Sequence, residues 1–352
     1  MRTVDDEKLM AFVGKVIGDL GAIASGPLVV LGDRLGLYRA MADGEPVTAA
    51  ELAQRTGTTE RYVAEWLSAQ AASGYVAYDG SGRFHLEAEQ AVALTDESSP
   101  ACVLGGFESF TAAAEIMPRL TEAFRTGVGV AWGEHNPSLF SGTARFFRPG
   151  YLANLVESWL PALDGMTERL DRGAKVADIG CGYGHSTTLM ADAYPKSTFT
   201  GFDAHGPSID AAAKLAAESG RSHHLDFRVA TAKTFDGGPY DLICYFDCLH
   251  DMGDPAGALS HARSQLSSDG TVMIVEPMAG DELADNLHPL GRLFYSVSTL
   301  VCTPASLSEE VGTALGAQAG PARTQEIAER AGFSRFRKAA ETPFNFVYEL
   351  RP

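Results

Sequence analysis

The stretch from Lys175 to Ser186 reads Lys-Val-Ala-Asp-Ile-Gly-Cys-Gly-Tyr-Gly-His-Ser, and it decides the fold of the chain. It opens with an apolar run that carries a carboxylate near its end, as expected for a short buried strand. Glycines follow at positions 180, 182 and 184. Glycines so spaced allow a sharp turn and let a ligand approach main-chain N–H groups without meeting a Cβ atom. Because residues 185–193 read as a helix, the stretch predicts a strand, a glycine loop and a helix that bind a nucleotide-type ligand.

Strands and helices alternate over the rest of the C-terminal half. The helix boundaries include Ser208 as a candidate cap and an Asp254-Pro255 start signal. Alternation of this kind predicts an α/β fold with a mostly parallel, doubly wound, Rossmann-like sheet that binds ligands at the carboxyl ends of its strands. The strand candidates are residues 175–179, 198–202, 226–229, 242–246, 271–275, 336–340 and 346–350.

The loop residues exclude two common nucleotide fingerprints. The dinucleotide pattern G-x-G-x-x-G would place its third glycine at His185, and no Gly-Lys-Ser/Thr follows, as a P-loop requires. Asp178, at the end of the first strand, would repel a pyrophosphate but suits a cationic ligand. Asp203 ends the second strand, and its carboxylate is placed to accept hydrogen bonds from ribose hydroxyls.

The N-terminal third predicts a winged helix. Thr48 and Glu51 form a capping box for a helix that stops at Gly57, and a second helix follows from about Thr59 to Gly74. Residues 75–78 and 83–86 then alternate like two strands joined by a Gly-rich turn.

Charge argues against DNA binding by this winged helix. The candidate recognition helix, residues 58–73, carries Arg61 against two glutamates, and the wing, residues 75–92, carries one arginine against three acids. DNA binding depends on cations that neutralise phosphates, whereas the whole chain has a formal net charge of -17. A structural or dimerising role is favoured.

The first helix is strongly amphipathic, because apolar residues recur at three- and four-residue steps between positions 9 and 23. Such a stripe at a chain end favours packing on a second subunit; the alternative is packing on its own domain. The helix runs without a proline until Pro27.

Length and composition favour a protein of two domains, or one large one, in the cytoplasm. The chain has 352 residues, and its five cysteines form no CxxC pair and are odd in number, which favours reduced thiols. The N-terminus lacks the apolar core of a signal peptide, and no stretch approaches the ~20 apolar residues of a membrane span. We therefore expect neither a nucleic-acid partner nor a membrane partner.

The middle segment is helical in tendency and rich in aromatic residues. Residues 107–124 predict one helix interrupted near Pro118, and the loop 127–137 contains Trp132 and His135. Aromatic density beside a catalytic domain suits a lid or a substrate wall, with a core between two domains as the alternative. The expected division is a winged-helix domain at 1–98, a helical linker and lid at 99–170, and a ligand-binding domain at 171–352.

The run from Asp178 to Gly184, with Asp203 downstream, resembles the signature of class I S-adenosylmethionine (SAM)-dependent methyltransferases. The resemblance covers roughly residues 151–352 and implies a seven-stranded sheet that ends in an antiparallel hairpin. With the winged helix included, the whole chain is similar to actinobacterial small-molecule methyltransferases related to the plant-type O-methyltransferases. In that group the winged helix dimerises, so the resemblance also implies a homodimer.

The resemblance assigns a role to each matching position. Gly180 and Gly182 would line the methionine moiety of SAM, Asp178 would orient its ammonium group, and Asp203 would hold the ribose. Thr231 falls where the adenine contact lies, although an acid is common there, and residues 246–251 would border the methionine end and the substrate. The predicted cofactor-binding set is Asp178, Gly180, Cys181, Gly182, Asp203, Ala204, Thr231, Ala232, Phe246 and Asp247.

His250 is the candidate catalytic residue. Methyl transfer to a hydroxyl gains from a base that takes the proton, and an imidazole with an ordinary pKa near ~6.5 suits that task. The His-Asp pair at 250–251 resembles the plant-type enzymes, in which this histidine is the base; Asp251, Glu276 or Glu309 could orient it. The alternative is a histidine that only caps the turn or the next helix.

No metal site is expected. His223 and His224 lie in a polar loop and read as solvated, and Asp247 and Asp251 lack a third ligand in sequence. Tyr295, in the glycine-interrupted segment 285–319, could cover the substrate and joins Trp132 and His135 as a candidate substrate-binding residue.

These patterns predict a SAM-dependent methyltransferase that acts on a small molecule, with oxygen as the expected methyl acceptor. Two alternatives stay open. One is a winged-helix transcriptional regulator that senses SAM or a metabolite, and the other is an enzyme of the same fold that binds SAM without methylating.

Overall fold

The computed structural model describes residues 4–218 and 224–352, which form two compact units, Met1–Thr111 and Ala112–Pro352. The expected linker, residues 99–170, is thus shared between the two units rather than standing apart. Its role as a lid stays a prediction.

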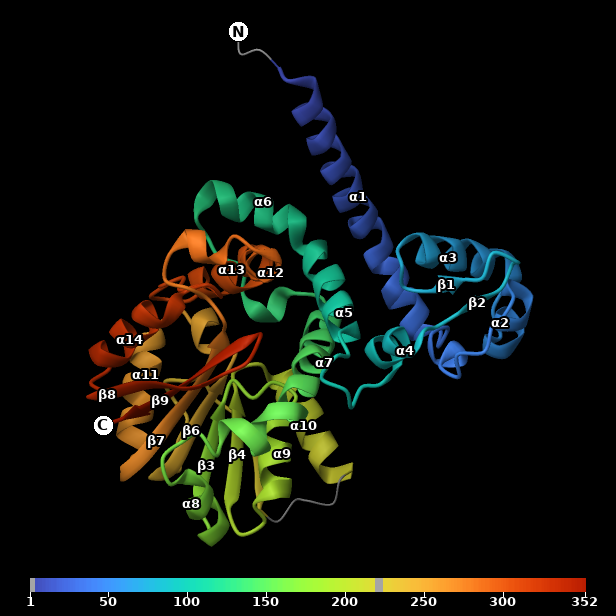
Figure 1. Ribbon diagram of the computed structural model, residues 1–352. Helices are drawn as coiled ribbons and strands as arrows, with labels where there is room; N and C mark the ends of the chain where they lie inside the picture. The colour runs from blue at the N-terminus through green and yellow to red at the C-terminus, as the bar shows by residue number, and fades with distance from the viewer. Residues whose placement is uncertain (1–3, 219–223) are drawn as a thin grey trace. The chain divides into compact units, whose positions relative to one another are not determined.

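A seven-stranded sheet forms the centre of the second unit (Figure 1). Its order is β5-β4-β3-β6-β7-β9-β8, and all neighbours are parallel except β9, which runs antiparallel to both β7 and β8. Every strand predicted in the C-terminal half lies within an observed one, so the predicted α/β fold is confirmed. The strands are β3 (Lys175–Ile179), β4 (Thr198–Asp203), β5 (Leu225–Val229), β6 (Tyr240–Phe246), β7 (Leu266–Pro277), β8 (Arg335–Glu341) and β9 (Asn345–Arg351).

Helices cover both faces of this sheet. Successive strand residues point to opposite faces, so Leu242 and Cys244 of β6 enter one core and Ile243 and Tyr245 enter the other. The first core is closed by α8 (Met166–Arg172), α9 (His185–Ala193) and α10 (Gly206–Glu218), and the second by α11 (Pro255–Gln265) and α14 (Gly320–Arg330). The central strands β3, β6 and β7 are covered on both faces, which explains their near-continuous apolar sequences, whereas β5 and β8 are largely exposed.

Two helix boundaries differ from the prediction. The expected single helix at 107–124 is split into α5 (Leu104–Ala113), η2 (Ala114–Ile116) and α6 (Met117–Thr126), so the break precedes Pro118, which occupies the first turn of α6. Proline is tolerated there because first-turn N–H groups have no helical partner. Helix α10 starts at Gly206, which places Ser208 inside its first turn rather than at its cap.

The remaining elements of the second unit lie before and after the sheet strands. Asp254 caps α11 as predicted, accepting a hydrogen bond from the Gly257 N–H at 2.8 Å. Before β3 lie η3 (Trp132–Glu134), α7 (Pro137–Asn154) and η4 (Leu155–Trp159); η5 (Leu249–Asp251) follows β6, and after β7 come η6 (Leu283–Asn286), α12 (Pro289–Val297), η7 (Ser298–Cys302) and α13 (Thr303–Leu307).

The first unit is the predicted winged helix. The Thr48–Glu51 capping box is present, and Gly57 ends α2 in the left-handed conformation. The apolar face of α3, with Trp66 and Leu67, is buried as expected. The unit contains η1 (Arg39–Met41), α2 (Ala49–Thr56), α3 (Glu60–Ala72), the ribbon β1 (Ala77–Tyr78) and β2 (Phe84–His85), and α4 (Ala88–Thr95).

Helix α1 (Asp6–Arg34) is capped by Asp5 and continues through Pro27. By length and composition it could cross a membrane, with a mean hydropathy of 1.4 over its most apolar window, so the expectation that no stretch approaches that length is wrong. The predicted apolar stripe is exposed along its length. Its members are Leu9, Phe12, Val13, Val16, Ile17, Leu20 and Ile23.

Candidate active site

The glycine loop follows β3 and has three residues in the left-handed region. Gly180, Gly182 and Gly184 have φ of 71°, 53° and 73°. A Cβ at Gly180 would lie 2.8 Å from Cys248 Sγ, and one at Gly184 would lie 2.4 Å from the Phe227 ring, whereas one at Gly182 would meet nothing within 4 Å. The outer glycines therefore permit close packing, and the middle one leaves open space beside the loop for a ligand.

Asp178 lies on β3 directly under this loop and is fully buried. Its Oδ2 accepts hydrogen bonds from Ser186 Oγ at 2.6 Å and Thr187 Oγ1 at 2.7 Å, while Oδ1 has no hydrogen-bond partner among the described residues. Burial raises the pKa of this carboxyl to about 6 against the opposing effect of those two hydroxyls. A buried carboxylate with one unpaired oxygen favours a cationic partner.

Asp203 ends the neighbouring strand β4 and is oriented by the backbone. Its Oδ2 accepts from the Gly182 N–H at 2.9 Å, and its Oδ1 accepts from the His205 N–H at 2.7 Å. These contacts lock the carboxylate beside the glycine loop, with lone pairs left for further donors. Asp203 therefore lies beside the glycine loop, and its ribose role stays a prediction.

Three other predicted cofactor positions lie at the same edge of the sheet. Ala204 is exposed next to Asp203, and exposed Thr231 and half-buried Ala232 follow β5. Thr231 Oγ1 pairs with Thr234 Oγ1 at 2.9 Å, so its hydroxyl is engaged within the loop. The adenine role of this loop stays a prediction.

The turn after β6 carries a strained aspartate. Asp247 has a φ of 49°, unusual for a residue with a Cβ, and it is 8% exposed. Asn345 Nδ2 donates to its Oδ1 at 2.7 Å, and Oδ2 has no hydrogen-bond partner within the described chain. Burial, and then the nearby Glu276, raise the pKa of Asp247 well above its ordinary value.

Phe246, directly before Asp247, has a different environment from the one expected. Its ring packs on Tyr151 and Trp159 in the core, with centroids 5.4 Å and 6.4 Å away. Packing of this kind favours a structural role for the side chain over the predicted cofactor contact.

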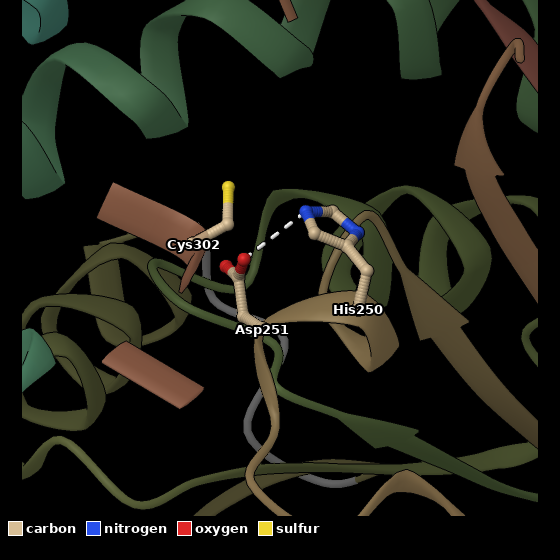
Figure 2. Close-up of side chains that lie close together, drawn as sticks. All are labelled: His250, Asp251 and Cys302. Atoms are coloured by element: carbon tan, nitrogen blue, oxygen red, sulfur yellow. Dashed lines mark ion pairs between the residues drawn. The ribbon is translucent and has the colours of Figure 1, made fainter. Parts of the chain in front are cut away.

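His250 lies in η5 with both ring nitrogens facing carboxylates. Nδ1 contacts Glu276 Oε2, and Nε2 lies 3.0 Å from Asp251 Oδ1 (Figure 2). Glu276 Oε1 also accepts from the Leu249 N–H at 3.1 Å, so one carboxylate holds both the turn and the imidazole. Burial opposes the charged ring, but the carboxylates of Glu276 and Asp251 outweigh it and raise the pKa of His250 well above 6.5.

Of the three candidate orienting acids, two contact His250 and one does not. Glu309 instead accepts from the Gly253 N–H at 2.9 Å and so secures the chain just beyond the turn. The imidazole itself is only 4% exposed, whereas the Asp251 side chain is 24% exposed and forms the accessible end of the cluster.

Cys302 of η7 adds a thiol to this cluster, which the sequence alone did not indicate. His250, Asp251 and Cys302 each offer an atom, and these atoms lie within 4.8 Å of one another, a grouping that could hold a metal ion (Figure 2). Burial, followed by the charge of Asp251, raises the pKa of Cys302 to about 12. A metal would have to displace the thiol proton in order to use Cys302 as a ligand.

An aromatic wall connects the surroundings of Asp203 to the middle segment. The Phe140 ring lies 4.3 Å from the His205 ring and 5.3 Å from the Trp132 ring, and Trp132 lies 6.5 Å from His135. Phe140 and Trp132 share a cluster with Tyr183 of the glycine loop and Val301, which precedes Cys302. The wall thus reaches both the loop and the surroundings of His250.

Two further predicted positions have less defined surroundings. Tyr295 lies half-buried on α12, and its substrate role stays a prediction. His224 Nε2 lies 3.1 Å from the Ala191 carbonyl oxygen rather than being fully solvated, and His223 lies outside the described residues.

Fold and site together define a class of protein. The strand order, the terminal antiparallel hairpin, and the glycine loop flanked by Asp178 and Asp203 are those of the class I SAM-dependent methyltransferase fold. His250 and Asp251 lie after β6, and Glu276 lies near the end of β7, so all three stand at the carboxyl edge of the sheet where ligands bind.

Comparisons with known proteins match two family models. Residues 170–332 match the family model described as "Methyltransferase domain", and residues 23–96 match the "Rv2258c-like winged HTH domain". The chain therefore contains a methyltransferase domain preceded by a winged-helix domain.

Individual relatives are more distant. Trans-aconitate 2-methyltransferase of Streptomyces avermitilis is 32% identical over 157 residues, which cover 42% of this chain and 58% of that protein. Methyltransferase ungE' of Aspergillus campestris is 30% identical over 156 residues, 40% of this chain and 42% of that protein. The chain thus spans less than two thirds of the length of these curated relatives.

Solved structures share the fold over almost the whole chain. The mitomycin 7-O-methyltransferase MmcR has a TM-score of 0.72 at 20% identity, covering 99% of this chain and 100% of its own. Human N-acetylserotonin methyltransferase in complex with SAM has a TM-score of 0.71 at 17% identity, covering 100% and 99%. Both include the N-terminal unit in the match.

Proposed function

We propose that this protein transfers a methyl group from SAM to a hydroxyl oxygen of a small molecule. The single observation that supports it most is the open space beside Gly182, whose N–H holds the carboxylate of Asp203. Asp178, with one unpaired oxygen, lies on the strand that leads into the same loop. SAM is a cation with a ribose. Its charged end suits the first carboxylate, and its two ribose hydroxyls suit the second.

The proposed catalytic base is His250, which stands on the turn after β6. Most of the rate of methyl transfer comes from alignment of two bound reactants, and removal of the hydroxyl proton adds to it. Because Glu276 and Asp251 favour the imidazolium, His250 accepts a proton only in the fraction of molecules in which the ring is neutral. Asp251, whose side chain is 24% exposed, is the more accessible of the two carboxylates.

The acceptor would lie against the aromatic wall, with Trp132 and His135 as substrate-binding residues and Tyr295 as a third candidate. Relatives whose names specify O-methylation, such as mitomycin 7-O-methyltransferase, support oxygen as the target. The N-acetylserotonin methyltransferase and PigF structures contain SAM and S-adenosylhomocysteine (SAH), which supports the cofactor.

We further propose a homodimer formed through α1. A single-sided row of exposed apolar side chains is costly in water and is covered favourably by a second copy of the same helix. Lys15 Nζ donates to Asp19 Oδ2 at 2.7 Å on the same helix. This ion pair suits a solvent-exposed face that lies away from the proposed apolar interface. The five cysteines, all within the described part of the chain, form no disulfide, which suits the cytoplasm.

The test of this function is methyl-transfer itself. The protein is incubated with methyl-labelled SAM and a panel of phenols and aliphatic alcohols, and the products are detected by mass spectrometry. Labelled methyl ethers, formed about 10²- to 10⁴-fold more slowly by His250→Ala, are the expected result. SAM consumed without label transfer would indicate a different reaction of the same fold, and DNA binding without either would indicate the regulator.

A further inference from the structure

The cluster of His250, Asp251 and Cys302 has the composition of a metal site. The side chains come from two segments far apart in the chain, and one ligand atom of each lies within 4.8 Å of the others (Figure 2). Neighbouring ligands of a tetrahedral zinc ion are about 3.3–3.6 Å apart, given zinc–ligand distances of about 2.0–2.3 Å. The 3.0 Å between His250 Nε2 and Asp251 Oδ1 is close to that separation. Small side-chain movements would therefore let the three residues share one ion.

Asp251 supplies an oxygen that the fold leaves without a hydrogen bond. Its Oδ1 is buried and lies 3.0 Å from His250 Nε2, yet the two atoms are not in hydrogen-bonding geometry, and no other described residue donates to this oxygen. A buried carboxylate oxygen without a donor is unfavourable and favours a cation as its partner. Because the Asp251 side chain is 24% exposed, an ion can reach the cluster from this side.

Glu276 holds the imidazole in the way that a metal ligand requires. Its Oε2 contacts His250 Nδ1, and its Oε1 accepts a hydrogen bond from the Leu249 N–H at 3.1 Å. With Nδ1–H donated to Glu276, the lone pair on Nε2 is the one that faces the other two ligands. Histidines that bind zinc usually donate their second ring N–H to a carboxylate, which fixes the tautomer and increases the basicity of the ligating nitrogen.

The donor set selects for zinc. Cys302 ends the π-helical turn η7, and such turns are frequent at functional sites. One nitrogen, one oxygen and one sulfur suit Zn²⁺, whereas Mg²⁺ and Ca²⁺ prefer oxygen ligands. The Asp251 carboxylate and the Cys302 thiolate together balance the charge of a divalent ion, which on binding displaces the protons of the thiol and of Nε2. Three protein ligands leave a fourth position for water.

We propose that His250, Asp251 and Cys302 form an inhibitory Zn²⁺ site, in which the ion occupies the ring nitrogen that would otherwise accept the proton of the acceptor hydroxyl. A lone pair bound to zinc cannot take up a proton. Zinc binding and base catalysis therefore exclude each other at His250. The inhibition rests on the proposed function, whereas the binding of the ion rests on the cluster alone.

Zinc binding is measured on the full chain, freed of metal and of any histidine tag, by competition with a zinc-responsive dye. The natural protein should bind one Zn²⁺ per chain and should not bind Mg²⁺. Cys302→Ala should weaken the zinc affinity by more than about 100-fold, because loss of a ligand should exceed the 10- to 100-fold effect of losing a residue that only supports one. Cobalt-loaded natural protein should show a thiolate-to-metal charge-transfer band that is absent from Cys302→Ala.

Two further variants separate loss of the site from loss of the fold. Cys302→Ser keeps the size of the side chain and should also lose the charge-transfer band. The matched control is Cys102→Ala, which alters a buried cysteine of the winged-helix unit and should keep the zinc affinity of the natural protein. Thermal unfolding shows that each variant is folded.

Inhibition is measured as methyl transfer with and without Zn²⁺, each variant being compared with its own zinc-free rate. Saturating zinc should reduce turnover of the natural protein by about 10²- to 10⁴-fold, the loss expected without a base, and a chelator should restore it. Turnover of Cys302→Ala should resist the same zinc concentration. The slow turnover of His250→Ala should fall no further.

Three results would overturn the inference: no complex of one zinc ion per chain, equal zinc affinity in Cys302→Ala and the natural protein, or undiminished turnover at saturating zinc. Failure of the metal-free protein to bind SAH would instead refute the proposed function. In that case the zinc titration and the cobalt spectrum would still decide whether the cluster binds the ion.

Discussion

At the scale of single residues, His250 gains its properties from two carboxylates. Replacing it with Ala should reduce turnover by about 10²- to 10⁴-fold, the usual contribution of a positioned base, and leave SAH affinity unchanged. Steady-state kinetics and calorimetry measure the two effects separately. His261→Ala, which alters a histidine packed on Phe235, is the control. Unchanged turnover in His250→Ala would exclude the base role.

The pH dependence follows from the same contacts. A pKa raised above 6.5 means that the neutral, proton-accepting ring is populated only at higher pH, so kcat should rise as pH increases past neutrality. Glu276→Gln removes one of the two carboxylate charges beside His250 and should move this rise in kcat to lower pH. The maximal kcat should also be lower, because the imidazole is held less firmly. A pH profile of kcat at saturating SAM shows both effects. A rise at the same pH in both proteins would contradict this mechanism.

Removing the charge of Asp178 should stabilise the ligand-free protein but weaken the binding of SAM. Because burial raises its pKa to about 6, the folded state binds a proton that the unfolded state releases near pH 4, and stability falls as pH rises between those values. The difference between a folded-state pKa of about 6 and an unfolded-state pKa near 4 corresponds to about 3 kcal/mol of unfolding free energy. Asp178→Asn should therefore raise the ligand-free Tm at pH 7, not at pH 4, and weaken SAM binding by roughly 10- to 100-fold. A lower Tm at pH 7, or undiminished affinity, would contradict the assigned role.

At the scale of elements, α1 is the segment whose exposed stripe needs a partner. Phe12→Glu combined with Ile17→Glu should convert the protein to monomers, because two charges would be buried in an apolar interface. Sedimentation velocity measures the change, and Lys15→Glu on the same helix is a charge-changing control that should remain dimeric. A monomeric natural protein, or a dimer that survives both substitutions, would show that α1 is not the interface.

The elements also show how far local sequence determines this structure. All seven strands, the helix from His185 to Ala193 and the Thr48–Glu51 cap were predictable, because period, capping residues and glycines act locally. The split of the helix before Pro118 and the early start of α10 were not, since neighbouring turns decide those boundaries.

The active site divides in the same way. The glycine loop and Asp203 could be placed because they end adjacent strands. Cys302 beside His250, Asn345 beside Asp247 and the His205–Phe140 stack could not, because each joins segments far apart in the chain. Of these three contacts, only the His205–Phe140 stack had a signal in the local sequence, because His205 follows Asp203 by two residues.

At the scale of the whole molecule, charge separates an enzyme from a DNA-binding regulator. Arg61 of α3 pairs with Glu65 at 2.5 Å and Arg83 of the wing pairs with Glu51 at 3.1 Å, so both cations of the candidate DNA-binding surface are already neutralised. With a net charge of -17, the protein should not retard duplex DNA from its own upstream region in a gel at about 150 mM salt. A specific shift would favour the regulator.

The most direct test of the whole interpretation is calorimetric titration of the ligand-free protein with SAH, SAM, NAD and ATP. We expect SAH and SAM to bind at one site per chain and to raise the Tm. At a ligand concentration 100 times Kd, binding should add about 2.7 kcal/mol to the free energy of unfolding. Both ligands should bind more weakly to Asp203→Ala. NAD and ATP should not bind. Binding of NAD with no response to SAH or SAM would contradict the assignment of the glycine loop and, with it, methyl transfer.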